Sequence, residues 1–380
     1  MGFELARLIA GQIFLHACMA GMRMAAPLMA LREGYSEAAV GVLLALFALT
    51  QVFLALPAGR YADRQGVRRP LALSVAVATA GAGAAAAFPI FPVLCLSALM
   101  VGGATGVASI ALQRHVGRAA SGATQLRQVF SWLAIGPALS NFLGPFLAGL
   151  LIDHTGFRIA FFAMALLPLA TWFWVRRTRE LPPVAAPPGA RRGAAWDLLA
   201  QPQFRRLMLV NWLLSSCWDV HTFVVPVLGH QRGLSASVIG TLLGAFALAA
   251  TFVRIAMPLL AARLQEWKVI TVAMAATALL FVVYPLVPTA WAMGLCSVLL
   301  GLALGSVQPM IMSTLHQTTP EHRHGEALGL RLMAINGSSV VMPILFGVAG
   351  AAVGVAGVFW SVGALVAGGT RLALRMKPAD

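Results

Sequence analysis

The stretch ALPAGRYADRQGVRRPL, residues 55–71, concentrates charge within an apolar chain. Five charged side chains fall within ten positions, whereas only 10% of the 380 residues are charged. These five are Arg60, Asp63, Arg64, Arg68 and Arg69. Because long apolar runs lie on both sides, the pattern predicts a short charged loop between two hydrophobic helices. Gly66 would allow a tight turn with positive φ in that loop.

The composition indicates a protein of the lipid bilayer. Hydrophobic residues make up 59% of the chain and the mean hydropathy is +0.84, whereas a soluble domain carries about 25% charged residues. The formal net charge of +15 comes from basic residues spread over short loops, so it does not indicate nucleic-acid binding. All four cysteines lie in apolar runs without metal-ligand spacing, and the sequence predicts neither a metal site nor a cofactor.

A helix needs about 20 apolar residues to cross the hydrocarbon core, and twelve segments meet this need. They are 6–30, 37–58, 70–89, 91–112, 126–151, 157–175, 206–229, 235–261, 268–287, 289–312, 327–350 and 353–373. With this count, 22 of the 27 Lys and Arg residues fall on the side of the N-terminus and 3 on the other side. The positive-inside rule therefore predicts two cytoplasmic termini, and we expect a multi-pass protein of a bacterial-type inner membrane.

An internal repeat divides the chain. GYSEAAVGVLLALFAL (34–49) and GLSASVIGTLLGAFAL (233–248) are identical at eight of sixteen positions, at an offset of 199 residues. A segment rich in Pro, Gly and Arg separates the two copies and predicts a cytoplasmic linker at 177–204. We therefore expect an all-α membrane protein of twelve helices in two pseudo-symmetric six-helix bundles, residues 1–176 and 205–380. Substrate sites in such repeats lie near the membrane midplane, between the repeats.

The opening stretch resembles the signature loop between helices 2 and 3 of the major facilitator superfamily. The pattern is Gly, three residues, Asp, Arg, any residue, Gly and then basic residues, and the matching positions are Gly59, Asp63, Arg64, Gly66 and Arg68. The resemblance implies a conformational latch, in which Asp63 contacts a basic residue and the positive N-terminal end of a helix from the other half. Arg114 and Arg118 are the candidates for that basic residue. The alternative is a loop whose arginines only fix topology, which explains neither the glycines nor Asp63.

Two further segments resemble the same family, in particular its bacterial 12-helix drug and sugar efflux antiporters. GPALSNFLGPFLAG (136–149) is similar to a Gly-Pro-rich antiporter motif, with Gly136, Gly144, Pro145 and Gly149 matching. The resemblance implies a bent, closely packed helix and favours export, although ordinary helix packing is the alternative. TTPEHRHGEALGLR (318–331) resembles the loop between helices 10 and 11. By contrast, LSALMVGGATG (96–106) lacks the arginine that many proton antiporters of this family carry in helix 4.

Charges inside the membrane are costly and mark functional positions. Of the twelve acids, only Asp219 lies deep in a predicted span, whereas the other eleven lie in loops or at helix ends. We expect Asp219 to couple proton movement to transport, or alternatively to form a structural ion pair. Arg23 and Arg254 are the two basic residues inside spans; Arg23 could pair with Asp219, and Arg254 could reach the cytoplasmic surface instead. Other candidates for the cavity are His221, Asn141, Asn211, Trp218, Gln308 and Asn336.

These observations predict a secondary transporter and not an enzyme, since the motifs GxxxxGK[ST], HExxH and GxSxG do not occur. The first hypothesis is proton-coupled efflux of a small amphipathic organic compound or drug by alternating access. Proton-coupled uptake of a small metabolite and a non-transporting membrane sensor or scaffold are the alternatives. The expected partners are the lipid bilayer, protons and a small-molecule substrate, without nucleic acid. The sequence carries no motif for an oligomeric state.

Overall fold

A computed structural model of the protein describes residues 2–35, 37–181, 195–234, 236–260 and 263–377. Within these ranges every regular element is a helix. Contacts divide the chain into two compact units, which are described separately. Unit 1 comprises Met1–Ala120, Leu133–Ala195 and Pro320–Gly337, and unit 2 comprises Ser121–Trp132, Trp196–Thr319 and Ser338–Asp380.

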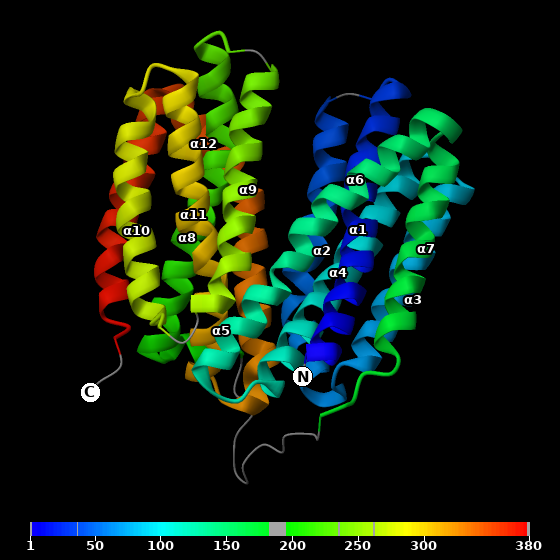
Figure 1. Ribbon diagram of the computed structural model, residues 1–380. Helices are drawn as coiled ribbons and strands as arrows, with labels where there is room; N and C mark the ends of the chain where they lie inside the picture. The colour runs from blue at the N-terminus through cyan, green and yellow to red at the C-terminus, as the bar shows by residue number, and fades with distance from the viewer. Residues whose placement is uncertain (1, 36, 182–194, 235, 261–262, 378–380) are drawn as a thin grey trace. The chain divides into compact units, whose positions relative to one another are not determined.

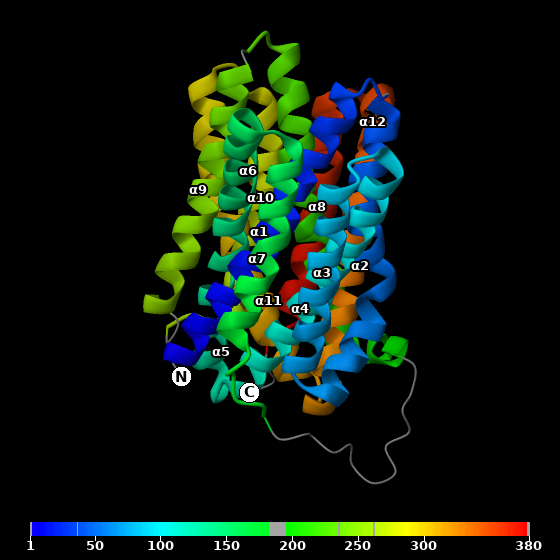
Figure 2. The ribbon, with the colours of Figure 1, turned by 90° about the vertical axis from the view of Figure 1, so that its right-hand side faces the viewer.

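Unit 1 contains six long helices from the first half of the chain (Figure 1). They are α1 (Gly2–Arg32), α2 (Glu37–Gln65), α3 (Arg68–Ala87), α4 (Phe91–Ala119), α6 (Ile135–Thr155) and α7 (Phe157–Val175). α1 packs against α6 and α7, and α4 packs against α2 and α3. Figure 2 shows α1, α6 and α7 side by side. The core between the helices is apolar, with Met22, Phe47 and Phe161 among its buried side chains.

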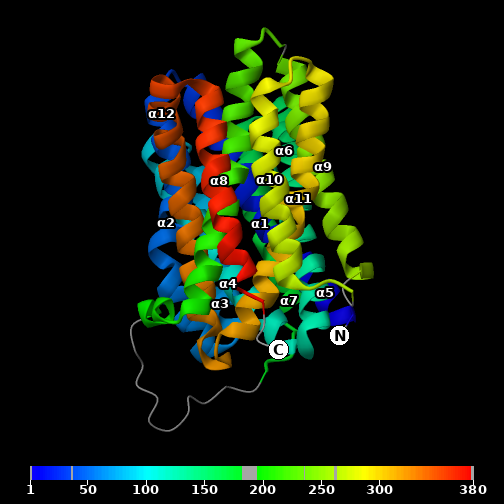
Figure 3. The same ribbon diagram turned by 90° about the vertical axis from the view of Figure 1, so that its left-hand side faces the viewer.

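Unit 2 contains the helices of the second half and one helix of the first. They are α5 (Gly122–Leu133), the short η1 (Ala195–Ala200), α8 (Pro202–Gln231), α9 (Ala236–Leu260), α10 (Glu266–Val283), η2 (Tyr284–Leu286), α11 (Ala290–Thr318) and most of α12 (His324–Leu374). α11 packs against α8, α9 and α10, an arrangement visible in Figure 3. The short η3 (Glu321–Arg323) and the first residues of α12 belong to unit 1.

The internal sequence repeat is also visible in the structure, as an equivalent close contact between two helices in each unit. A Cβ added to Gly102 of α4 would collide with the carbonyl of Phe47 in α2, and one added to Gly301 of α11 would collide with the carbonyl of Phe246 in α9. Both the two glycines and the two phenylalanines are 199 residues apart, the offset found in the sequence. In each unit, therefore, a glycine at the equivalent position allows two helices to cross closely, α4 with α2 and α11 with α9.

Ten helical segments of the described chain are long and apolar enough to cross a membrane. The 30-residue α8 and the first part of α12 add two more stretches where crossings are expected. The architecture is that of an all-α polytopic protein and is consistent with twelve crossings. Residues 182–194 of the predicted linker 177–204 lie outside the described residues.

One of the predicted spans differs in detail from the structure. The span 126–151 consists of two helices, because α5 ends at Leu133 and α6 begins at Ile135. Pro137 explains the break, since it lacks the N–H that would bond to the carbonyl of Leu133 four residues earlier. The spans 327–350 and 353–373 correspond to two helices within α12, which the non-helical backbone of Gly354 separates (φ 74°, ψ 169°). Glycine adopts this conformation without a Cβ clash, so the chain can turn there between two helices.

Candidate functional site

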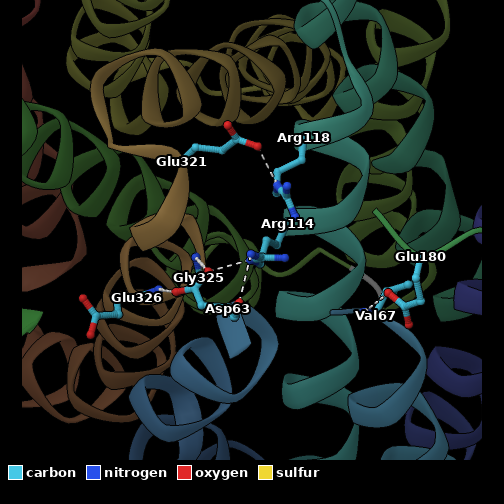
Figure 4. Close-up of polar contacts among 8 residues, drawn as sticks. All are labelled: Asp63, Val67, Arg114, Arg118, Glu180, Glu321, Gly325 and Glu326. Carbon is cyan, nitrogen blue, oxygen red and sulfur yellow. Dashed lines mark hydrogen bonds and ion pairs between the residues drawn. The ribbon is translucent and has the colours of Figure 1, made fainter. Parts of the chain in front are cut away.

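Asp63 lies at the end of α2 in unit 1 and is surrounded by hydrogen-bond donors (Figure 4). Arg114 of α4 donates from Nε to its Oδ1 at 2.5 Å, and from Nη2 to its backbone carbonyl at 3.3 Å. The backbone N–H groups of Gly325 and Glu326 donate to the two carboxylate oxygens at 2.9 and 3.2 Å. The Asp63 side chain is 10% exposed and that of Arg114 is 3% exposed. We call these four residues the Asp63 cluster.

The first turn of α12 supplies two of the donors to Asp63. α12 begins at His324, so Gly325 and Glu326 belong to the N-terminal turn, whose N–H groups have no partner within the helix. The partial positive charge of a helix N-terminus stabilises a carboxylate. The approach is close because a Cβ on Gly59 would collide with the Gly325 carbonyl, and a Cβ on Gly325 would collide with the Gly59 carbonyl. The two glycines thus allow backbone-to-backbone packing of α2 on α12.

Glu180, just beyond α7, organises the other end of the signature loop. Its carboxylate accepts hydrogen bonds from the backbone N–H groups of Val67 at 3.1 Å and Arg68 at 2.7 Å, at the start of α3. Gly66 has a φ of 73°, as the turn between α2 and α3 requires. Arg68 also donates from Nε to the carbonyl of Thr178 at 2.7 Å. The loop is therefore held by an acid that follows the last helix of the first half.

Two more ion pairs join the segment 320–337 to the rest of unit 1. Arg118 of α4 donates to Glu321 at 2.7 Å, and Arg60 of α2 donates to Glu326 at 2.9 Å. The partners Glu321 and Arg60 are 53% and 47% exposed, so both pairs lie near solvent. Arg64, the remaining charged member of the signature, is exposed.

Unit 2 contains a second buried acid at a helix end. Glu266, the first residue of α10, accepts hydrogen bonds from Arg127 of α5, and from Ser313 and Gln317 of α11, each at 2.8 Å. The Glu266 and Arg127 side chains are 16% and 8% exposed. We call these four residues the Glu266 cluster.

Asp219 lies in α8, within unit 2, and is half-buried. Its Oδ2 lies 3.5 Å from the hydroxyl of Ser338, which donates to it. On the neighbouring residue, the indole of Trp218 lies 5.6 Å from the guanidinium of Arg254, which sits over its face. Arg254 also donates to the carbonyl of Gly305 at 3.4 Å and is only 9% exposed. Three of the predicted cavity residues therefore lie on α8 and α9 of one unit.

His221 occupies a packed position in unit 2. Its ring stacks on Phe246 at 4.0 Å between centroids, and its Nε2 lies 3.0 Å from the hydroxyl of Ser297. Tyr284 shares that hydroxyl at 2.8 Å. The side chain of His221 is fully buried among these aromatic and hydroxyl groups.

The other predicted residues are spread over both units. Arg23 and Asn141 are exposed on α1 and α6 of unit 1, and Asn336 of α12 donates to the carbonyl of Leu332. In unit 2, Asn211 is buried in α8 and Gln308 is half-buried in α11.

The Gly-Pro-rich motif of α6 lies against α1. A Cβ on Gly144 would collide with the carbonyl of Ala17, and one on Gly136 would press against Gln12. Gly149 lies in ordinary contact distance of Met24, and Pro145 lies inside the helix. The small residues thus let two helices approach closely, as small residues do in membrane bundles.

The model of the Major Facilitator Superfamily matches residues 8–325 and 207–379. The chain belongs to this family. It is a multi-pass membrane transporter and not an enzyme.

Two relatives within the family are tetracycline resistance proteins. The class B protein of Escherichia coli is 26% identical over 327 residues, which cover 81% of this chain and 78% of the relative. The class D protein of Salmonella ordonez is 28% identical over 334 residues, which cover 83% of this chain and 82% of the relative.

Solved structures of low sequence identity share the fold. A bacterial homologue of the iron transporter ferroportin, in an outward-facing state, has a TM-score of 0.82 at 14% identity, with 98% of this chain and 99% of that chain covered. The human organic anion transporter MFSD10 has a TM-score of 0.79 at 17% identity, with 97% and 99% covered.

Sequence reasoning overlooked Glu180 and Glu266, since it assigned no role to acids in loops and at helix ends other than Asp63. For Glu266 a signal was present, because this acid directly precedes the predicted span 268–287, and acids are enriched in the first turn of a helix. What the sequence did not contain is the spatial neighbour of each acid.

Proposed function

We propose that the chain is a secondary active transporter that exports a small amphipathic organic compound in exchange for protons. The observation that carries the proposal is Asp219, a half-buried carboxylate in the middle of α8. A carboxylate at membrane depth is retained at a cost in stability, which favours a functional role. The names of the two tetracycline resistance relatives support export of a drug-like compound.

In this proposal, two bundles formed by residues 1–176 and 205–380 rock about a central site in an inner membrane, with both termini in the cytoplasm. Asp219 exchanges its proton as its surroundings change between two states. Trp218, the residue before Asp219, and Arg254, which lies over the Trp218 ring, contribute aromatic and cationic groups, which suit a substrate with a ring system and a polar edge.

We also propose that the Asp63 cluster is the conformational latch. The segment that supplies Gly325 and Glu326 lies in the second half of the chain in sequence, yet it bonds to Asp63 of the first half within unit 1. Breaking these bonds would free the first turn of α12, and re-forming them would close one state. Gly59, Arg64, Gly66 and Arg68 shape the loop that presents Asp63.

Everted membrane vesicles with tetracycline as the probe test the proposal. A proton gradient should drive saturable uptake of tetracycline into the vesicles, and a protonophore should abolish it. Asp219→Asn should lower the gradient-driven rate by about tenfold or more. Asp153→Asn is the matched control, because Asp153 is exposed at the end of α6, and it should leave the rate unchanged.

Four results would overturn parts of the proposal. Transport that persists with the protonophore would exclude proton coupling, and equal rates in Asp219→Asn and the control would exclude Asp219. Gradient-driven accumulation in whole cells would indicate uptake. Proteoliposomes without saturable flux for tetracycline and a panel of amphipathic dyes would indicate a sensor or scaffold.

A further inference from the structure

A cavity of about 440 Å³ lies beside the signature loop in unit 1. It is formed by the end of α2, the turn to α3, the last turns of α4 and the segment after α7. Its lining contains five arginines, which are Arg64, Arg68, Arg69, Arg114 and Arg118. Volumes of this size accommodate small-molecule ligands in other proteins.

The two acids in the lining are already engaged with helix N-termini. Asp63 accepts two N–H groups from the first turn of α12, and Glu180 accepts two N–H groups at the start of α3. Helix N-termini carry partial positive charge, so they compensate these carboxylates. Two of the arginines also form ion pairs, Arg114 with Asp63 and Arg118 with Glu321. Five arginines against two acids in the lining still make the cavity cationic.

Two of the arginines are held in fixed orientations. Arg68 is anchored through Nε by the carbonyl of Thr178, and Arg114 is anchored through Nε and Nη2 by Asp63. A guanidinium has five N–H donors, so these contacts leave each of the two with unused donors among the described residues. Fixed guanidinium groups lose little entropy when they bind an oxyanion.

We propose that this cavity binds a phosphate-bearing anion, either a phospholipid headgroup or a soluble phosphate compound. A phosphate group offers several oxygens to several guanidinium groups at once, with bidentate geometry, whereas a carboxylate offers only two. The cavity lies at the ends of the membrane-spanning helices α2, α3 and α4, the depth at which basic pockets meet headgroups. This site is distinct from the proposed substrate site around Asp219 and does not depend on the transported compound.

The site is linked to Asp63 through Arg114. An anion in the cavity shares this guanidinium with the Asp63 carboxylate, and the two negative groups repel each other. Anion binding and the bonds of the Asp63 cluster therefore oppose each other, and the coupling is reciprocal. Removing the charge of Asp63 should tighten anion binding, whereas removing an arginine should weaken it.

Thermal unfolding of the full chain in a neutral detergent, titrated with inorganic phosphate against chloride at equal ionic strength, tests the proposal. Phosphate should raise the Tm of the wild type saturably. Arg69→Gln should raise the apparent Kd about tenfold, the loss expected for one charge-assisted contact. Arg158→Gln is the matched control, because Arg158 is exposed at the start of α7, outside the cavity, and it should behave as the wild type.

A second arm identifies the source of the anion. The Tm of the wild type and of Arg69→Gln is measured in phosphatidylcholine nanodiscs with and without phosphatidylglycerol. Phosphatidylglycerol should raise the Tm of the wild type, and Arg69→Gln should lose this shift. A response to phosphate alone assigns a soluble ligand, and a response to phosphatidylglycerol alone or to both assigns the headgroup. No saturable response in either arm, or equal responses in Arg69→Gln and Arg158→Gln, would overturn the proposal. Asp63→Asn, where it folds, should lower the apparent Kd, and a raised Kd would contradict the coupling to Arg114.

Discussion

The Asp63 cluster of unit 1 and the Glu266 cluster of unit 2 each hold a partly buried carboxylate at the end of a long helix. In both, a segment that belongs by sequence to the other half of the chain provides donors: residues 320–337 in unit 1 and residues 121–132 in unit 2. The donors differ in kind. The segment in unit 1 offers backbone N–H groups of a helix terminus, whereas the segment in unit 2 offers the side chain of Arg127.

This difference sets how tolerant each contact is to change. Backbone donors reach a carboxylate only when the two main chains touch, so the Asp63 cluster requires Gly59 and Gly325. A long arginine side chain bridges a wider gap and can adjust its rotamers. When the two segments separate slightly, the glycine-dependent contact is therefore lost at once, whereas the arginine-dependent contact weakens gradually.

The largest effect is expected from Asp63→Asn. The substitution leaves Arg114, which is 3% exposed, without its carboxylate, and breaking a buried ion pair costs about 3–5 kcal/mol. Hydrogen exchange of residues 320–337 should accelerate strongly, because the first turn of α12 loses the negative charge and one of its two acceptor oxygens. Unchanged exchange in this segment would show that Asp63 does not hold it.

The next effect tests the backbone contact. Gly59→Ala places a Cβ against the Gly325 carbonyl, and overpacking of this kind costs about 1–3 kcal/mol. Gly83→Ala in α3 is the matched control, because nothing lies within 4 Å of the added Cβ and alanine favours helices by about 1 kcal/mol. Exchange in 320–337 and the rate of transport should respond only to Gly59→Ala. A similar response to both would assign the effect to helix propensity instead of contact.

A smaller effect is expected at the Glu266 cluster. Glu266→Gln removes the charge but keeps an acceptor for Ser313 and Gln317, so we expect a loss of about 1–2 kcal/mol. A double-mutant cycle with Arg127→Gln, read by the thermal stability of the purified protein, isolates the pair. The two substitutions should be clearly non-additive. Additive losses would mean that Arg127 and Glu266 do not interact in solution.

The smallest effect concerns the solvent-exposed pair of Arg60 and Glu326. Arg60 is 47% exposed, and surface pairs of this kind contribute about 0–1 kcal/mol. Arg60→Gln should shift the Tm by less than any substitution above, and the shift should vanish at about 1 M salt, where screening acts within 3 Å. A loss of stability as large as that of Asp63→Asn would show that Arg60 stabilises the segment 320–337 as strongly as the Asp63 cluster does.

The fold was predictable because its signals are local and repeated. A bilayer requires long apolar helices, and these are read directly from runs such as 91–112 and 289–312. The break inside 126–151 was also encoded locally, by Pro137, although a hydropathy reading passes over it. The break between 327–350 and 353–373 within α12 depends on the backbone of Gly354, whose conformation a glycine permits but does not dictate.

The site was predictable only in part. The signature loop identified Asp63 and the need for a basic partner, because an acid among arginines is conspicuous in an apolar chain. The choice of Arg114 over Arg118 follows from one helical turn of α4, which directs Arg114 to Asp63 and Arg118 to Glu321. No local pattern distinguishes two arginines four residues apart on one helix face.

The sequence by itself determined a helical membrane protein of repeated halves, since hydrophobic length, loop charge and the offset of 199 are properties of the chain alone. Only the tertiary structure decided which segments join which unit, and hence that Glu180 and Glu266 are engaged acids. The physical reason is distance along the chain. Arg127 and Glu266 are separated by 139 residues, and a contact of that range depends on how whole helices pack, which no short stretch of sequence specifies.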